Sequence, residues 1–264
     1  MGAGDDNGDS DKRMTLWEHL EELRTRLIRS LLGLVGAMVV TTIFGKQILA
    51  FLKYPYDRVV EDLKDSYPNL RVNLSTLSVL SPMEIYFRVA LYGGLVLAAP
   101  WILYQTWLFI AAGLYPKERR YVKLTVPFST LLFFCGAMFF VFVAAVPAMR
   151  FLIWFGVWLG LDPIITLDSH ISFMTSMMLI FGITFQTPLA VLILAKVGLV
   201  SVKTLNHYRK HVIVGILIVA AVATPSPSPL DQIVLGVPMW MLYELGVLLA
   251  YIATRKKGGP PQEA

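Results

Sequence analysis

The sequence predicts an all-α, polytopic membrane protein with six transmembrane helices, both termini in the cytoplasm and the last two helices short. The first observation behind this prediction is composition, because 56% of the 264 residues are hydrophobic, 16% are charged and the mean hydropathy is +0.63. A soluble domain is roughly 45–50% apolar and about 25% charged. The second observation is that the apolar residues form long stretches. The third is that lysine and arginine concentrate in alternate connections between these stretches.

Six stretches are candidate spans, since a helix needs about 20 mostly apolar residues to cross the hydrocarbon core. They are residues 28–52, 89–116, 124–149, 171–195, 212–224 and 230–254. The fifth has only 13 residues before the proline-rich run that leads into the sixth, so these two form a short hairpin. The spans imply external loops at 53–80, 150–170 and 225–230 and cytoplasmic loops at 113–123 and 196–211. The loop 53–80 is long for a connection and is expected to contain short helices.

The positions of the basic residues predict the orientation. Cytoplasmic loops of membrane proteins carry an excess of lysine and arginine. Of the 23 basic residues here, 16 lie in the N-terminal stretch, in the loops 113–123 and 196–211 or at the C-terminus. Both termini are therefore expected in the cytoplasm. The positive net charge of +5 then reflects topology, and no nucleic-acid partner is expected.

A single membrane domain, residues 14–254, is predicted between two tails. Residues 1–13 are expected to form a disordered acidic tail, and residues 255–264 a basic, proline-containing cytoplasmic tail. Residues 15–29 have the leucine spacing of an amphipathic helix that leads into the first span. On this helix Glu22 and Arg26 stand one turn apart in the favourable order.

The chain has none of the short motifs that carry common enzymatic chemistry. It contains no GxxxxGK[ST] or GxGxxG phosphate cradle, no HExxH among its four histidines and no GxSxG nucleophile turn. An ATP-driven pump and an intramembrane enzyme therefore lack support, and no cofactor or metal is expected.

Acids in basic or apolar surroundings are the candidate functional residues. Glu118 is the single acid in the basic stretch 117–123, where it either forms a solvated salt bridge or serves a partner. Glu22 lies on the same predicted side of the membrane. Two carboxylates on one face match guanidinium groups, which bind carboxylates with two parallel hydrogen bonds that lysine cannot reproduce.

Two further polar residues lie inside predicted spans. Glu244 is near the middle of the last span, where an ionised carboxylate costs about 2.5–3.5 kcal/mol on insertion scales. Gln186 precedes Pro188, whose missing N–H leaves a carbonyl that Gln186 or a water can satisfy. Each serves either packing or partner docking. Glu84 and Arg88, one turn apart, are expected to pair at the entry to the second span.

Several of these motifs together resemble the TatC family, the multispanning subunit of the twin-arginine protein translocase. The N-terminal HLEELRTRL segment looks like the family's signature before its first span. The remaining matching segments occur in the family's order from about residue 14 to 250. They are SPMEIYF at 81–87, PWILYQTWLFIA at 100–111, GLY at 113–115, KERR at 117–120, TP at 224–225, PM at 238–239 and YELG at 243–246.

The resemblance implies a receptor for folded cargo proteins whose signal peptides carry two consecutive arginines. Carried over by motif, Glu22 and Glu118 are the expected arginine-binding carboxylates, and Phe109 shapes the site. His19 and Arg24 are expected to hold the N-terminal segment against the first cytoplasmic loop. The location implied is the bacterial cytoplasmic (inner) membrane.

The partners implied by the resemblance are single-span TatA- and TatB-type subunits, other copies of this chain and membrane lipid, with transport driven by the proton-motive force. Glu244 and Gln186 are the expected partner-docking positions within the membrane. The alternative interpretation is an ATP-independent secondary transporter of small molecules. Such a transporter usually has inverted repeats, and the two halves of this sequence have none that we detect.

Three positions depart from the family pattern. Ala112 replaces a common proline, Gln186 replaces an acid present in many members, and Ser228 replaces an acid between the prolines of the last hairpin. Any role that needs a titratable group at residue 186 is therefore in question. Asp231 is a possible substitute for the hairpin acid.

Overall fold

The computed structural model describes residues 16–66, 74–113, 116–161, 165–223 and 229–255, without the side chains of 64–66, 116–124, 222–223, 229–231, 234 and 255. The described residues are helical apart from short connections and one isolated bridge between Ser75 and Thr166. The prediction of an all-α fold is therefore confirmed. The helices are α1 (Leu16–Ile43), α2 (Gly45–Ser66), α3 (Ser81–Ala112), α4 (Pro116–Phe139), the π-helix η1 (Phe140–Ala144), α5 (Ala145–Trp158), α6 (Leu167–Thr184), α7 (Thr187–Val197), α8 (Val202–His207), α9 (Arg209–Ala223) and α10 (Pro229–Arg255).

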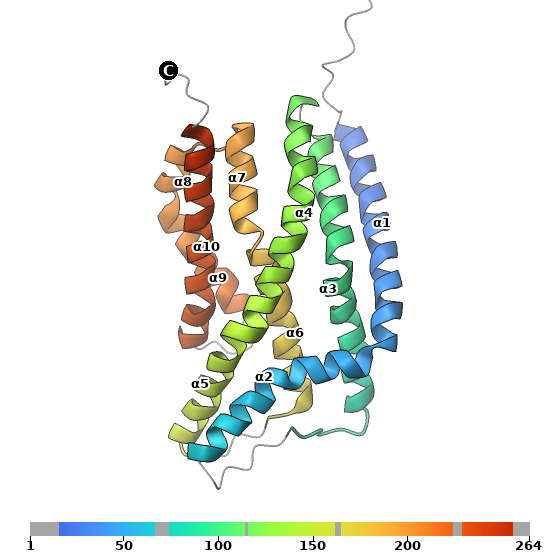
Figure 1. Cartoon of the computed structure of the whole chain (residues 1–264), viewed down its shortest axis with the longest axis vertical. Helices are drawn as coiled ribbons and strands as arrows, with labels where there is room; N and C mark the ends of the chain where they lie inside the picture. The colour runs from blue at the N-terminus through green and yellow to red at the C-terminus, as the bar shows by residue number, and fades with distance from the viewer. Residues whose placement is uncertain (1–15, 67–73, 114–115, 162–164, 224–228, 256–264) are drawn as a thin grey trace, which may run out of the picture.

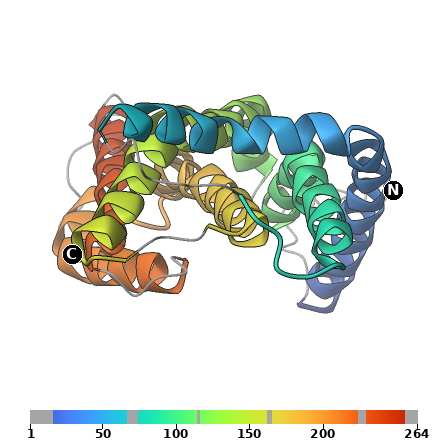
Figure 2. The ribbon, with the colours of Figure 1, turned by 90° about the horizontal axis from the view of Figure 1, so that it is seen from below.

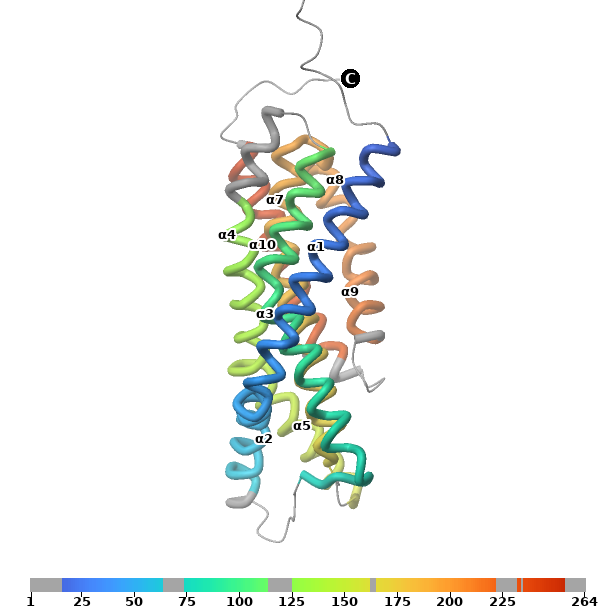
Figure 3. The backbone as a smooth tube through the Cα atoms, turned by 90° about the vertical axis from the view of Figure 1, so that its right-hand side faces the viewer, coloured from blue at the N-terminus to red at the C-terminus, as the bar shows by residue number. Residues whose placement is uncertain are grey.

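The helices are arranged as an elongated arc. Seen along the long axis (Figure 2), α1 and α3 lie at one end of the arc, α9 and α10 at the other, and α6 between them. α1 packs mainly on α3, and α10 packs mainly on α7 and α9 (Figures 1 and 3). The start of α1 and the end of α10 share one end of the molecule, which we call the inner end. The opposite, outer end holds α2 and α5 (Figure 1).

Within the described parts of the chain, five segments are long and apolar enough to cross a membrane, namely 16–43, 81–112, 125–158, 167–197 and 235–254. α9 has 15 residues, fewer than the roughly 20 needed for a full span, and so is short as predicted. α10, with 27 residues, lies within one residue of the predicted bounds 230–254 at each end and is long enough to span, so of the two last helices only α9 is short. The number of six spans and the cytoplasmic side of both ends stay predictions, although the shared inner end is compatible with them.

The end of α1 corrects the predicted first span at 28–52. The expected amphipathic helix and the span form one continuous helix, which ends at Ile43. The chain bends between α1 and α2 (Figure 1). Tyr86 of α3 stabilises this bend, because its hydroxyl donates a hydrogen bond to the carbonyl of Thr42. A Cβ on residue 45 would lie 2.6 Å from the Tyr86 ring, so Gly45 is what allows the close approach.

α2 replaces much of the predicted external loop 53–80. Its buried residues Leu52, Tyr56, Val59 and Leu63 recur at the spacing of one helix face and cover α5 and α6. The segment is therefore helical as far as Ser66, with one helix of 22 residues that begins at Gly45 in place of the short helices expected within the loop. The charged residues on the opposite face of α2 hid the apolar stripe from a search for uncharged segments.

The other connections are also more helical than predicted. α4 begins at Pro116, inside the predicted loop 113–123, and proline is favoured in the first turn of a helix. The same rod continues through η1 to Trp158, well into the predicted loop 150–170, and α8 fills part of 196–211. The helices thus extend beyond the apolar stretches that identified them. The predicted tails 1–13 and 256–264 and the turn 225–228, with Ser228, lie outside the described residues.

The predicted fourth span is broken in the middle. α6 ends at Thr184 and α7 begins at Thr187, with Pro188 in the first turn of α7. Proline has no N–H to donate to the preceding turn, so the helix ladder is interrupted there. The break separates the outer half of the molecule from the inner half.

The two halves are packed differently. The largest apolar cluster lies in the outer half and includes Leu52, Ile85, Phe140, Ile171 and Met174. Towards the inner end the buried apolar residues fall into two smaller clusters, one between α7 and α10 around Tyr243 and one between α3 and α7 around Trp107. The inner half is therefore not a single core.

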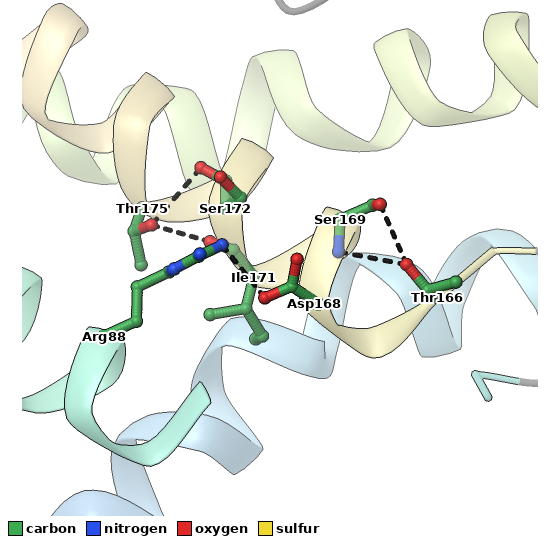
Figure 4. A network of polar contacts seen from close by, with 7 residues as sticks. All are labelled: Arg88, Thr166, Asp168, Ser169, Ile171, Ser172 and Thr175. Carbon is green, nitrogen blue, oxygen red and sulfur yellow. Dashed lines mark hydrogen bonds and ion pairs between the residues drawn. The ribbon is translucent and has the colours of Figure 1, made fainter. Parts of the chain in front are cut away.

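Ion pairs join separate helices at the outer end. Arg88 of α3 pairs with Asp168 at the start of α6, with an N–O distance of 3.0 Å (Figure 4). Arg150 of α5 pairs with Asp62 of α2. The expected pairing of Arg88 with Glu84 is therefore wrong, because the partner comes from a segment distant in sequence.

Candidate functional site

The inner end of α1 holds a carboxylate in a defined position. Arg26 Nε donates a hydrogen bond of 2.7 Å to Glu22 Oε1, and its Nη2 lies 2.6 Å from the same oxygen. The two residues are one helical turn apart, which is the arrangement favoured for such pairs. The Glu22 side chain stays 23% exposed, so the carboxylate is fixed but accessible.

Gln105 of α3 holds the Arg26 side of the Glu22–Arg26 pair in place. Arg26 Nη1 donates a hydrogen bond of 3.0 Å to Gln105 Oε1, and Gln105 is only 2% exposed. A buried neutral amide accepts from the guanidinium without adding charge, so Arg26 is held by a rigid partner on one side and by Glu22 on the other. Both Arg26 contacts fall on Oε1, and a carboxylate accepts on both oxygens. Oε2 therefore retains acceptor capacity.

His19 and Phe109 join the first turn of α1 to the end of α3. Their rings stack with centroids 4.4 Å apart and an interplanar angle of 20°. Gly113 lies against the His19 ring, since a Cβ at residue 113 would be 3.5 Å from His19 Cε1. Farther down, Trp101 Nε1 donates to the carbonyl of Arg29 at 2.9 Å. These contacts dock the N-terminal part of α1 on α3.

Two predicted residues of this site remain, Arg24 and Glu118. Arg24 is exposed, on a different face of α1 from His19 and Arg26. Glu118 lies in the first turns of α4, at the same inner end, but its side chain falls outside the described residues.

Gln186 belongs to a buried hydrogen-bonded triad. Ser129 of α4 donates to Gln186 Oε1 at 2.7 Å, and Gln186 Nε2 donates to the carbonyl of Ser129 at 2.9 Å. Trp107 of α3 donates to Ser129 Oγ at 2.9 Å. The amide thus binds α4 instead of the carbonyl freed by Pro188. None of the three side chains titrates near neutral pH, so this triad is a neutral clamp across α3, α4 and the α6–α7 break.

Glu244 of α10 is not an isolated acid. Arg209, the first residue of α9, lies 2.7 Å from Glu244 Oε2, and the side chains are 47% and 28% exposed. Pairing lowers the cost of a carboxylate inside a span. The pair lines a surface cavity of about 420 Å³ together with Asn206 and Tyr251.

Sequence reasoning missed three residues of these networks. Gln105 and Ser129 are polar residues within apolar stretches, and the same signal that identified Gln186 applies to them. Arg209 was visible only as one of several basic residues in a loop. Its partner is 35 positions away, and no local spacing reveals that contact.

The composition, the five apolar segments and the arc of helices define a multi-pass helical membrane protein. Comparison with known proteins gives the family. The chain belongs to the TatC family of Sec-independent protein translocase proteins, whose family model matches residues 18–238.

Relatives and solved structures agree with this assignment. The TatC protein of Aquifex aeolicus is 36% identical over 245 residues, which cover 92% of this chain and 98% of that one. The TatC protein of Carboxydothermus hydrogenoformans is 33% identical over 240 residues, covering 91% and 94%. A crystal structure described as twin arginine translocase receptor TatC is 34% identical, with a TM-score of 0.77 and coverage of 90% and 100%.

Family membership confirms several predictions. This is a multi-pass inner-membrane protein of a protein-translocation family, and the family is not enzymatic. A protein-translocation role implies protein cargo, which favours the translocase interpretation over a small-molecule transporter.

Proposed function

We propose that this chain is the receptor of a twin-arginine translocase, which binds the signal peptides of folded cargo on its cytoplasmic inner end and nucleates export driven by the proton-motive force. The observation that carries the proposal is the Glu22 carboxylate, accessible and held in place by Arg26 on buried Gln105. The description of a similar solved structure as a receptor supports it.

The chemistry of this arrangement favours guanidinium over ammonium. Glu22 already accepts two contacts from one guanidinium, and its second oxygen keeps acceptor capacity for another. A planar guanidinium places two N–H groups parallel to a carboxylate, whereas an ammonium acts as a point charge. We propose Glu118 as the second carboxylate, because α4 begins beside the end of α3 at the same inner end (Figure 1).

The stacked His19 and Phe109 rings support a second part of the proposal. They form an aromatic surface between α1 and α3, and His19 lies three residues before Glu22 on α1. A signal peptide that carries apolar residues after its arginines is thereby guided from the charged site onto the surface of α3.

Partner docking completes the proposal. We propose that single-span TatA- and TatB-type subunits and other copies of this chain dock within the membrane, with Glu244 and Gln186 near the contacts. The cavity beside the Arg209–Glu244 pair opens on the surface of α8 and α10 and supports this placement for Glu244. Gln186 is engaged with Ser129, so its contribution is to hold α4 against the α6–α7 break.

Site-specific photo-crosslinking tests the receptor function. A photoreactive amino acid is introduced in the full chain at residue 23, 108 or 117, next to residues 22, 109 and 118 so that these stay intact, with residue 150 at the outer end as control. A signal peptide with paired arginines is expected to crosslink at the three inner positions and not at residue 150. The same peptide with paired lysines is expected to crosslink far less. Equal crosslinking of both peptides, or equal crosslinking at residue 150, contradicts the proposal.

A further inference from the structure

An apolar groove runs along α7 in the inner half of the molecule. α10 closes one side and α4 the other, and the two helices stand apart in front of α7 (Figure 1). The groove has a volume of about 390 Å³. Its lining includes Phe128, Leu132, Leu189, Leu192, Lys196 and Leu249.

One wall of this groove is firmly packed. Gly246 of α10 meets α7 so closely that a Cβ there would lie 2.9 Å from Pro188 Cα and 3.2 Å from Val191 Cβ. Across the groove, Phe128 of α4 is 59% exposed. The groove is therefore a fixed concavity between α7 and α10 with an open aromatic edge on α4.

The length of the groove matches one leaflet of a bilayer. It extends from Pro188, at the helix break in the middle of the molecule, to Lys196 in the last turn of α7. Eight residues of α-helix rise about 12 Å, and half of the hydrocarbon core is about 15 Å. A partner's transmembrane helix, about 10–12 Å wide and crossing both leaflets, fits this half-length groove poorly.

The charge of the groove lies at its inner end. Lys196 is the charged residue among those lining the groove, and a lysine directs its ammonium towards the headgroup region while its stem stays on apolar surface. Basic pockets between helices on the cytoplasmic side bind anionic headgroups. The apolar part thus suits an acyl chain, and the lysine suits the phosphate above it.

We propose that this groove binds one anionic phospholipid of the inner leaflet, with an acyl chain along α7 and the headgroup phosphate at Lys196. The lipid would fill the space between α4 and α7 that the protein leaves open. It would thereby brace α4, whose first turns carry Glu118, against the α7–α10 pair.

Native mass spectrometry of the full chain, released from nanodiscs of stated composition, tests this site. With equal amounts of phosphatidylglycerol and phosphatidylethanolamine, one phosphatidylglycerol molecule is expected to be retained preferentially. Lys196→Gln is expected to lower that preference about fivefold, the factor for one lysine near an anionic surface. Lys196→Arg is expected to keep it. Lys203→Gln is the matched control, because Lys203 is exposed on α8 at the same end and outside the groove, and it is expected to change nothing.

Leu192→Trp fills the groove and separates binding of the chain from binding of the headgroup. It is expected to abolish retention of both lipids, whereas Lys196→Gln abolishes only the preference between them. Equal retention of the two lipids by the unmodified chain overturns the proposal. So does an equal loss of preference in Lys203→Gln, which would indicate general surface charge. If Leu192→Trp fails to fold, the contrast among the three lysine variants still decides the question.

Discussion

The outer and inner halves of this molecule use charge in different ways. At the outer end, Arg88 pairs with Asp168 and Arg150 with Asp62, so each pair joins helices that are distant in sequence. At the inner end, Arg209 and Glu244 also join two helices, α9 and α10, but Glu22 and Arg26 are both on α1. The outer pairs therefore hold helices together beside the large core, whereas the Glu22–Arg26 pair orients one carboxylate on a helix that is already docked by His19, Phe109 and Trp101.

This difference predicts that substitutions at the inner end change mainly peptide affinity, whereas substitutions at the outer end change mainly stability. An i,i+4 ion pair on a helix contributes only about 0.3–0.5 kcal/mol, so we expect the inner end to stay folded without it. We expect the outer half, with its larger apolar cluster, to contribute most to stability, and the inner half, with smaller clusters and a groove, to hold the proposed binding surfaces.

Glu22→Gln is expected to have the largest effect on peptide binding. A hydrogen bond to a charged group contributes about 1.5–3 kcal/mol, so the affinity for a twin-arginine peptide should fall about ten- to hundredfold. The melting temperature in detergent should not change. Binding is measured by titration with a labelled peptide. Glu21→Gln is the matched control, because Glu21 is an exposed neighbouring acid. An equal loss in both variants would mean that only general negative charge matters.

Gln105→Leu is expected to weaken binding severalfold and also to lower stability. It leaves the Arg26 guanidinium without its buried acceptor, which costs about 1–3 kcal/mol. Arg26 then holds Glu22 less firmly. The measurements are peptide affinity and thermal unfolding, with Thr106→Ala on the exposed side of the same helix as control. Unchanged affinity would show that Gln105 has no part in positioning Glu22.

Asp168→Asn is expected to lower stability by about 0.2–1 kcal/mol, the usual range for a partly exposed ion pair, and to leave peptide affinity unchanged. Thermal unfolding measures the first effect. The control is Glu84→Gln, which removes the acid one turn from Arg88 that the sequence spacing suggested as its partner. A larger loss of stability in Glu84→Gln than in Asp168→Asn would indicate that Arg88 pairs with Glu84 and not with Asp168.

Tyr56→Phe is expected to have the smallest effect. Among the described residues the buried Tyr56 hydroxyl has no hydrogen-bond partner, so its removal should leave stability unchanged or slightly higher. Burial, together with nearby Asp57, raises the pKa of the Tyr56 phenol. The folded state thus disfavours ionisation, and any pH dependence from this group is a loss of stability above about pH 10, where the unfolded phenol ionises.

Tyr243→Phe provides the contrast to Tyr56→Phe in the inner half. The Tyr243 hydroxyl donates to the carbonyl of Leu205 at 2.9 Å, so its loss should cost about 1 kcal/mol. Thermal unfolding of both variants at pH 7 and at pH 10 measures the difference in their stability. A larger cost for Tyr56→Phe would point to a bound water or another partner at Tyr56.

The sequence predicts those features that depend on local pattern. The apolar stretches located the helices that became α3, α4 and α10, and the spacing of Glu22 and Arg26 gave their pair. Features that depend on contacts between distant segments were not predictable in this way. Arg88 pairs with Asp168, Arg209 with Glu244 and Gln186 with Ser129, and each partner is set by packing. For α2, the sequence predicts helix within the loop 53–80 but neither the start at Gly45 nor the length of 22 residues, because charged residues interrupt its apolar face.

The most direct test of the account is the ratio of affinities for paired-arginine and paired-lysine signal peptides, measured on the unmodified chain and on Glu22→Gln. Guanidinium recognition by a fixed carboxylate predicts a preference for arginine of about tenfold or more in the unmodified chain, largely lost in Glu22→Gln. If Glu22→Gln keeps the full preference for arginine, Glu22 does not read the guanidinium group, and the central claim is wrong.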